Sequence, residues 1–266
     1  MKSKLLFICW ALMVLSCTGE TSISEDIPPQ DPLSHITDGE VKRVLTAAMD
    51  KAGGLERWNK LASLQFTKDY SLLLESGEVE NAAFQQHLYT FGANPTVDIE
   101  WEKEEKAHAI HFKDGQYQKL LQGQPDTSMA QQSVINTVLS ATFVVSIPFK
   151  LLDEGVQLSY GGLDTLANGK VVEVLQASYD PEEHADHSTP DIWKHYYDAE
   201  DFTFVAYMVQ HADHYSYVEN QSFHEVEGFV LPKTRKSYRV DQDRNLLYLR
   251  ADYAYDDYKL GWASTD

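Results

Sequence analysis

Two copies of a short histidine and aspartate pattern are the residues whose types could do chemistry. His184-Ala185-Asp186-His187 is followed by His211-Ala212-Asp213-His214, with His195 and several carboxylates between them. Neutral imidazole and carboxylate groups together can bind zinc or another divalent ion. A strand over residues 202–210 that runs back from a turn near residue 198 would bring the two patterns together. One hypothesis is therefore a metal site at His184, His187, His211 and His214. We favour the alternative, a solvated acidic loop with surface histidines, because this spacing is common by chance.

Other catalytic patterns are absent from the sequence. It contains no Gly-x-Ser-x-Gly nucleophile elbow, no His-Glu-x-x-His pair, no phosphate-binding glycine loop and no dinucleotide fingerprint. Carboxylates are so numerous, 41 in all, that a close pair such as Glu104 and Glu105 gives little support for a glycosidase. We therefore expect no catalytic residue and no cofactor, and we predict that the protein is not an enzyme.

Cys17 stands at the end of a pattern typical of a bacterial lipoprotein signal. Lys2 and Lys4 precede an apolar run over residues 5–15, and Val14-Leu15-Ser16-Cys17 has the order of a lipobox. The run is too short to cross a bilayer, which takes roughly 20 apolar residues. We predict cleavage before Cys17 and lipidation of its thiol, with an ordinary secretory signal as the alternative. The other cysteine, Cys9, lies in the segment to be removed, which leaves no cysteine for catalysis, zinc or disulfides.

The charge of the chain argues against two classes of partner. Removing residues 1–16 removes two lysines and no acid, so the formal net charge changes from −19 to −21. Such an acidic protein is not expected to bind nucleic acid or to dock electrostatically on anionic lipid. We expect its contact with the membrane to be the lipid on Cys17.

The chain divides into a signal, a tether and one domain. Residues 1–16 are the predicted signal peptide, and residues 17–36 are the lipidated cysteine and a polar tether that Pro28, Pro29 and Pro32 keep irregular. Residues 37–266 are the predicted domain.

Two helical segments are expected in that domain. The first begins near Thr37, where Thr37-x-x-Glu40 fits a capping box, and ends at Gly53-Gly54. Its apolar face consists of Val41, Val44, Leu45, Ala48 and Met49. The second segment is expected to start at Pro125-Asp126-Thr127 and to continue into the apolar run over 143–149, which Pro148 breaks.

The rest of the domain alternates with a period of two. Apolar residues alternate with polar ones from Leu64 onward, and Asp114-Gly115 and Asn168-Gly169 are typical of tight hairpin turns. About ten or eleven antiparallel strands are expected. The fold class is therefore mainly β with two helical segments, as a curved antiparallel sheet or incomplete β-barrel covered by helices, with a two-sheet sandwich as the alternative.

Three stretches resemble known families. Residues 52–64, which read AGGLERWNKLASL, and residues 228–232, which read GFVLP, resemble the LolA/LolB-like superfamily of periplasmic lipoprotein carriers. Residues 147–156, IPFKLLDEGV, resemble an uncharacterised lipoprotein family of Bacteroidota with a similar architecture. The resemblance implies an incomplete barrel with an apolar cavity between sheet and helices that shelters acyl chains or another hydrophobic ligand.

The residues expected to face that ligand come from the alternating strands and the second helical segment. They are Phe66, Tyr70, Leu72, Ile99, Trp101, Val134, Val138, Leu139 and Phe149. Each could instead simply fill the core. The favoured hypothesis is a lipid-anchored envelope lipoprotein, placed at the outer membrane and facing the periplasm, that binds or transfers a hydrophobic ligand. A protein-interaction module with a filled core is the alternative, and a metal-dependent enzyme built on the histidine cluster is the third.

Overall fold

Thirteen antiparallel strands of the described residues form one sheet in the computed structural model, which describes residues 31–179 and 191–263. The order across the sheet is β6-β5-β4-β3-β2-β1-β13-β12-β11-β10-β9-β8-β7. Each strand therefore lies beside its neighbours in sequence, except that β6 and β7 stand at opposite edges and the last strand, β13, pairs with the first, β1. The strands are β1 (Leu61–Leu73), β2 (Val79–Thr90), β3 (Thr96–Lys103), β4 (Lys106–Lys113), β5 (Gln116–Leu121), β6 (Gln124–Pro125), β7 (Val156–Thr165), β8 (Val171–Tyr179), β9 (Ile192–Asp198), β10 (Phe204–Gln210), β11 (Tyr215–Val226), β12 (Phe229–Val240) and β13 (Leu246–Trp262).

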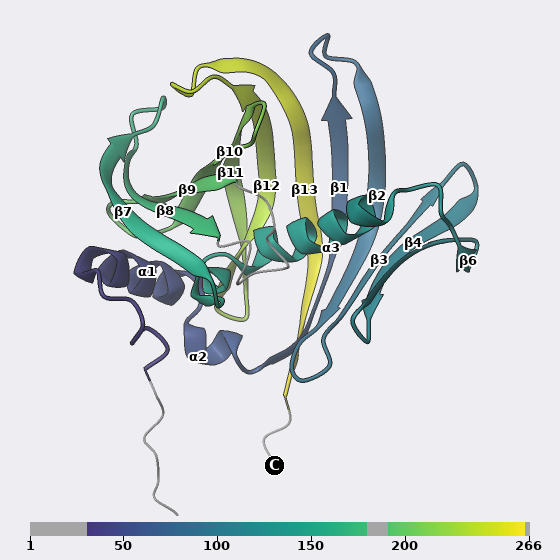
Figure 1. Cartoon of the computed structure of the whole chain (residues 1–266), viewed down its shortest axis with the longest axis horizontal. Helices are drawn as coiled ribbons and strands as arrows, with labels where there is room; N and C mark the ends of the chain where they lie inside the picture. The colour runs from purple at the N-terminus through teal and green to yellow at the C-terminus, as the bar shows by residue number, and fades with distance from the viewer. Residues whose placement is uncertain (1–30, 180–190, 264–266) are drawn as a thin grey trace, which may run out of the picture. The chain divides into compact units, whose positions relative to one another are not determined.

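The sheet is curved and does not close, since β6 and β7 remain its two edges. The chain passes from one edge to the other through helix α3 (Gln131–Ser146) and the short 3₁₀ helix η1 (Phe149–Leu152). Figure 1 shows α3 lying across the sheet between these edges. We call the side of the sheet that α3 covers the inner face. The predicted incomplete barrel covered by helices is confirmed, and the sandwich is wrong because every described strand belongs to one sheet.

Helix α1 (Gly39–Ala52) buries the apolar face that the sequence predicts, against β7, β8 and β12. Its cap differs from the prediction. Asp38, not Thr37, is the N-cap, and its carboxylate accepts hydrogen bonds from the backbone N–H groups of Glu40 and Val41 at 2.8 and 3.2 Å. Helix α2 (Leu55–Trp58) follows, and Trp58 stacks on Phe149 with ring centroids 4.6 Å apart.

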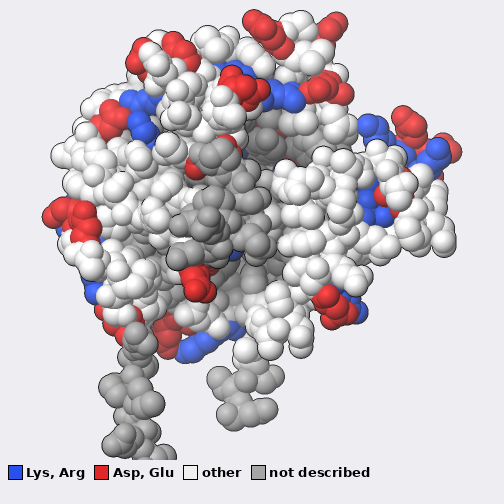
Figure 2. Space-filling view, in the orientation of Figure 1, with Lys and Arg blue, Asp and Glu red and all other residues white. Residues whose placement is uncertain are grey.

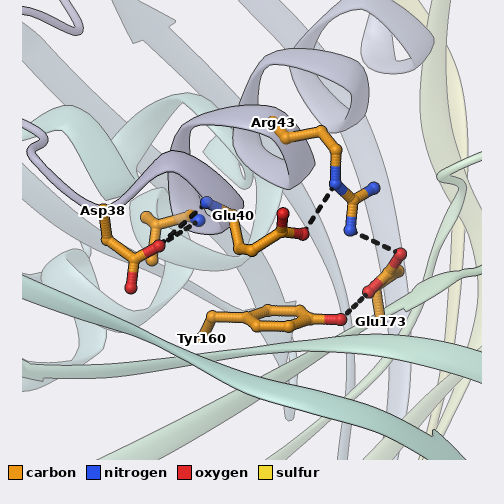
Figure 3. Close-up of polar contacts among 6 residues, drawn as sticks. Asp38, Glu40, Arg43, Tyr160 and Glu173 are labelled. Carbon is orange, nitrogen blue, oxygen red and sulfur yellow. Dashed lines mark hydrogen bonds and ion pairs between the residues drawn. The ribbon is translucent and has the colours of Figure 1, made fainter.

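A polar contact joins α1 to the sheet (Figure 3). Glu173 of β8 is buried, and its carboxylate accepts hydrogen bonds from Arg43 Nη2 at 2.8 Å and from the Tyr160 hydroxyl at 2.5 Å. Arg43 also donates to Glu40 at 2.9 Å. The bond to Glu173 raises the pKa of Arg43, and the bond to Glu40 adds to the rise. This network holds α1 on the edge of the sheet that carries β7 and β8.

The second helical segment starts later than predicted. Pro125 of β6 pairs with Leu120 of β5. Asp126 forms an ion pair with Lys119 and accepts a hydrogen bond from the Ser128 backbone N–H at 2.9 Å. These contacts hold residues 125–128 in a non-helical conformation, and the helix begins at Gln131. The predicted break at Pro148 is correct, since α3 ends at Ser146.

The main core lies between the inner face and the helices. A smaller cluster occupies the opposite face of β8 to β12, where the strands are buried on both sides. Among the described residues, no helix has both the length and the apolar character that a membrane span requires.

Candidate functional site

A cavity of about 470 Å³ lies between the inner face and helix α3. This volume falls within the range of roughly 300–1,000 Å³ that is usual for small-molecule sites. Strands from both halves of the sheet and one side of α3 form its wall. The lining residues are Lys68, Tyr70 and Leu72 of β1, Gln85 and His87 of β2, Ile99 of β3, Tyr207 of β10, Val218 of β11, Arg235 of β12, Tyr253 and Tyr255 of β13, and Asn136, Thr137, Ser140, Ala141 and Val144 of α3.

Helix α3 leaves space because the side chains that it turns toward the cavity are small. The side chains on the cavity side recur at helical spacing and are Asn136, Thr137, Ser140, Ala141 and Val144. The other side of the helix carries Val138, Leu139 and Thr142. The helix contains no charged residue. In Figure 2 the charged side chains gather mainly around the edge of this view, and the described part of its centre is largely uncharged.

Arg235 is the most unusual residue of the cavity wall. It is only 1% exposed, yet within the described part of the chain Nε and Nη2 have no hydrogen-bond partner. Nη1 donates a long hydrogen bond of 3.5 Å to the carbonyl of Val144 on α3. The guanidinium lies 5.4 Å from the ring centre of Tyr207 and 6.0 Å from that of Tyr255. Arginine keeps its charge in proteins, so a positive charge lies beneath the helix.

Lys68 brings a second cation to the same wall. Its Nζ lies 5.0 Å from the ring centre of Tyr70 and 5.2 Å from that of Tyr253. Burial lowers the pKa of Lys68, and the positive charge of Arg235 also acts to lower it. No carboxylate lines the cavity, and in the described part of the chain neither cation forms an ion pair.

His87 forms part of the wall near Lys68 as a neutral group. Its ring stacks on Phe66 at 4.7 Å, and its two nitrogens lie 2.9 Å from the Tyr89 hydroxyl and 3.2 Å from Gln85 Oε1. Burial holds the pKa of His87 well below its ordinary value, and Lys68 lowers it further. The ring therefore stays uncharged near pH 7 and adds no positive charge to the cavity.

A second, smaller hollow lies on the other side of α3. It has a volume of about 240 Å³ and is mostly apolar. Val138, Leu139 and Thr142 of the helix face it, opposite Tyr89, Val97 and neighbouring residues of the sheet.

The predicted ligand-facing residues are distributed over several places. Tyr70, Leu72 and Ile99 line the cavity. Val138 and Leu139 face the second hollow, and Trp101 stacks on His108 beside a separate surface depression. Phe66, Val134 and Phe149 are core residues that line neither hollow.

The predicted metal ligands are only partly visible. Two of them, His184 and His187, lie outside the described residues, as does the predicted lipidation site, Cys17. The rings of His211 and His214 are 4.3 Å apart, and their Nδ1 atoms bond to Asp191 at 3.0 Å and Asp213 at 2.6 Å. Within residues 31–179 and 191–263, no group of three or more His, Cys, Asp or Glu side chains is arranged to hold a metal ion. The four-histidine site thus stays a prediction.

Lys68 and Arg235 were not among the predicted site residues, although the position of Lys68 has a clear signal. Lys68 stands between Phe66 and Tyr70 in the apolar phase of β1, so alternation alone places it on the inner face. Arg235 shares its phase with Phe229 and Leu231, but exposed Lys233 interrupts the pattern where the register with β11 shifts. Its burial becomes evident only in the folded chain.

Solved structures share this architecture. A LolA superfamily protein from Nitrosomonas europaea matches with a TM-score of 0.55 at 11% identity, over 84% of this chain and 94% of that one. A protein from Vibrio parahaemolyticus, described as an outer membrane lipoprotein-sorting protein domain, matches with a TM-score of 0.52 at 9% identity, over 82% and 92%. A DUF1329 family protein from Desulfovibrio piger matches with a TM-score of 0.50 at 7% identity, over 85% and 95%. No protein-family model and no curated protein match the sequence.

These likenesses confirm the LolA-like fold that the sequence predicts. The resemblance to a Bacteroidota lipoprotein family stays a prediction. At this level of identity the fold is shared, and function has to be argued from the cavity itself.

Proposed function

We propose that this protein binds or transfers a hydrophobic, lipid-like ligand in the cavity between the sheet and α3. The observation that carries the proposal is the cavity of about 470 Å³, whose wall combines Leu72, Ile99, Val144 and Val218 with tyrosine rings. Burying apolar ligand surface there would contribute about 25 cal/mol per Å² before the costs of ordering. No covalent chemistry is needed for such a role.

The likeness to a lipoprotein-sorting protein domain and to a LolA superfamily protein supports a carrier function. The sequence around Cys17 supports a membrane anchor. Together they lead us to propose a lipid-anchored lipoprotein of the bacterial envelope, at the outer membrane and facing the periplasm. Its domain would then receive or hold its ligand close to the membrane surface.

The experiment is native mass spectrometry on residues 33–266, which form one compact unit in the described chain. The protein is purified from a bacterial host without detergent. We expect a co-purifying mass of lipid size that is lost in Ala141→Phe, since Ala141 faces the cavity and a phenyl ring would occupy it. The matched control is Ala82→Phe at an exposed position of β2 that does not line the cavity, which should retain the mass.

A bare protein mass that does not change when lipids are added would refute the carrier function. The protein-interaction module would then be the better hypothesis. Equal retention of the lipid by Ala141→Phe and Ala82→Phe would place the ligand elsewhere, and the second hollow beside Leu139 would be examined next.

A further inference from the structure

Two cations face one cavity, and none of the described residues in its wall is an acid. Lys68 enters from β1 and Arg235 from β12, two strands that lie on either side of β13. A charge removed from water is costly unless it is paired or hydrogen-bonded. This arrangement is therefore expensive for the empty protein, and it calls for a partner that the described side chains do not supply.

Tyrosine rings compensate the two charges only in part. Tyr207 and Tyr255 lie near Arg235, and Tyr70 and Tyr253 lie near Lys68, at ring-centre distances of 5.0 to 6.0 Å. Cation–π contacts of this kind are weak compared with the cost of burying a charge. The Tyr255 side chain also interacts with the guanidinium and helps to raise the pKa of Arg235, but Nε and Nη2 still have no acceptor of ordinary geometry among the described residues.

The free N–H groups point to the missing partner. Arg235 is 1% exposed, and its Nε and Nη2 atoms have no acceptor among residues 31–179 and 191–263. These two groups form the fork that binds both oxygens of a carboxylate or phosphate. Lys68 adds a point charge in the same cavity.

We propose that the natural occupant is a single-chain amphiphile with an anionic head, a carboxylate or a phosphate. Its acid group binds Arg235 and Lys68, and its chain lies along Leu72, Ile99 and Val144. This inference rests on the proposed function and specifies the ligand class of the same site. The size of the cavity suits one chain rather than a multi-chain lipid.

The test compares ligands that differ only in the head. Isothermal titration calorimetry is run on the full chain, stripped of co-purified lipid on a hydrophobic resin. The probes are dodecanoate, dodecyl phosphate, dodecanol and inorganic phosphate. A charge-assisted hydrogen bond contributes about 1.5–3 kcal/mol, so the anionic probes should bind at least about 10-fold more tightly than dodecanol.

Two substitutions assign the effect to the cations. Lys68→Gln should weaken the binding of dodecanoate about 10-fold and leave the affinity for dodecanol within about twofold of the wild type. Arg235→Gln should weaken the binding of dodecanoate more strongly and should also leave the binding of dodecanol within about twofold. If the Arg235 variant does not fold, Lys68→Gln still decides the test. The matched controls Lys194→Gln and Arg239→Gln change residues outside the cavity and should have no effect.

The outcomes separate this inference from the function on which it rests. Equal binding of dodecanol and dodecanoate would overturn the anionic head while leaving a hydrophobic carrier. Binding of inorganic phosphate as tight as that of dodecyl phosphate would overturn the amphiphile in favour of a small anion. If none of the chain-bearing probes binds, the carrier function itself fails. Preference for dodecanoate over dodecyl phosphate, or the reverse, identifies the head group.

Discussion

Replacing His195 by phenylalanine should make the protein more resistant to acid. His195 lies on β9 and is fully buried among Phe143, Trp193 and Phe204, with ring centres 5.8 to 6.2 Å away. Among the described residues neither ring nitrogen has a hydrogen-bond partner of ordinary geometry, and a backbone interaction with Leu175 offsets only part of the effect of burial. Burial lowers the pKa of His195 from 6.5 to about 3.

The sign of the effect follows from proton binding. Between pH 6.5 and 3 the unfolded chain binds a proton at this histidine and the folded protein does not, so stability falls as the pH falls. Each pH unit in this window costs about 1.4 kcal/mol from this group. Between pH 7 and pH 4.5 the expected loss is about 2.5 kcal/mol, a large fraction of a typical stability of roughly 5–15 kcal/mol.

The assay is urea denaturation of the wild type and of His195→Phe at pH 7 and pH 4.5. Phenylalanine has a similar shape and does not titrate, so the variant should lose about 2.5 kcal/mol less than the wild type over this interval. The same substitution at exposed His35 is the control and should follow the wild type. Parallel losses in the wild type and in His195→Phe would refute the argument that this ring is held neutral by burial.

Two further predictions concern the packing of α1. Glu173→Ala should lower the free energy of unfolding by about 1–2 kcal/mol more than Glu40→Ala does, because Glu173 is buried with two donors and Glu40 is an exposed partner of the same arginine. Equal losses in a urea titration would refute a structural role for the buried carboxylate. Gly53→Ala should cost at least about 1 kcal/mol more than Gly54→Ala. Both glycines have positive φ, but only at Gly53 would a Cβ lie 2.4 Å from Phe229, so similar thermal and urea midpoints for the two variants would contradict this packing.

Features that depend on neighbouring residues were predictable from the sequence. The buried face of α1 follows from helical spacing, and the turns at Asp114-Gly115 and Asn168-Gly169 follow from the positive φ that glycine accepts. The curved sheet was predicted from the long series of alternating strands. The cap at Asp38 was missed because Thr37 and Asp38 are both good N-caps, and only the backbone geometry decides between them.

Features that depend on distant residues were not predictable in the same way. The pairing of β1 with β13 and the passage of α3 from edge to edge are long-range contacts without a local pattern. The cavity arises because α3 turns Ser140 and Ala141 toward the sheet, and no sequence pattern showed which side of the helix would face it. Residues such as Phe66 and Phe149 are as apolar as a ligand site requires, yet they fill the core.

A crystal structure of the protein with 12-bromododecanoate would locate the ligand, since bromine is found by its anomalous scattering. We expect the carboxylate within hydrogen-bond distance of Arg235 and the bromine in the cavity between α3 and the sheet. An anomalous peak in the second hollow beside Leu139, or on the outer surface, would contradict the site. Full occupation of the cavity by protein side chains, with no bound chain, would contradict the carrier function.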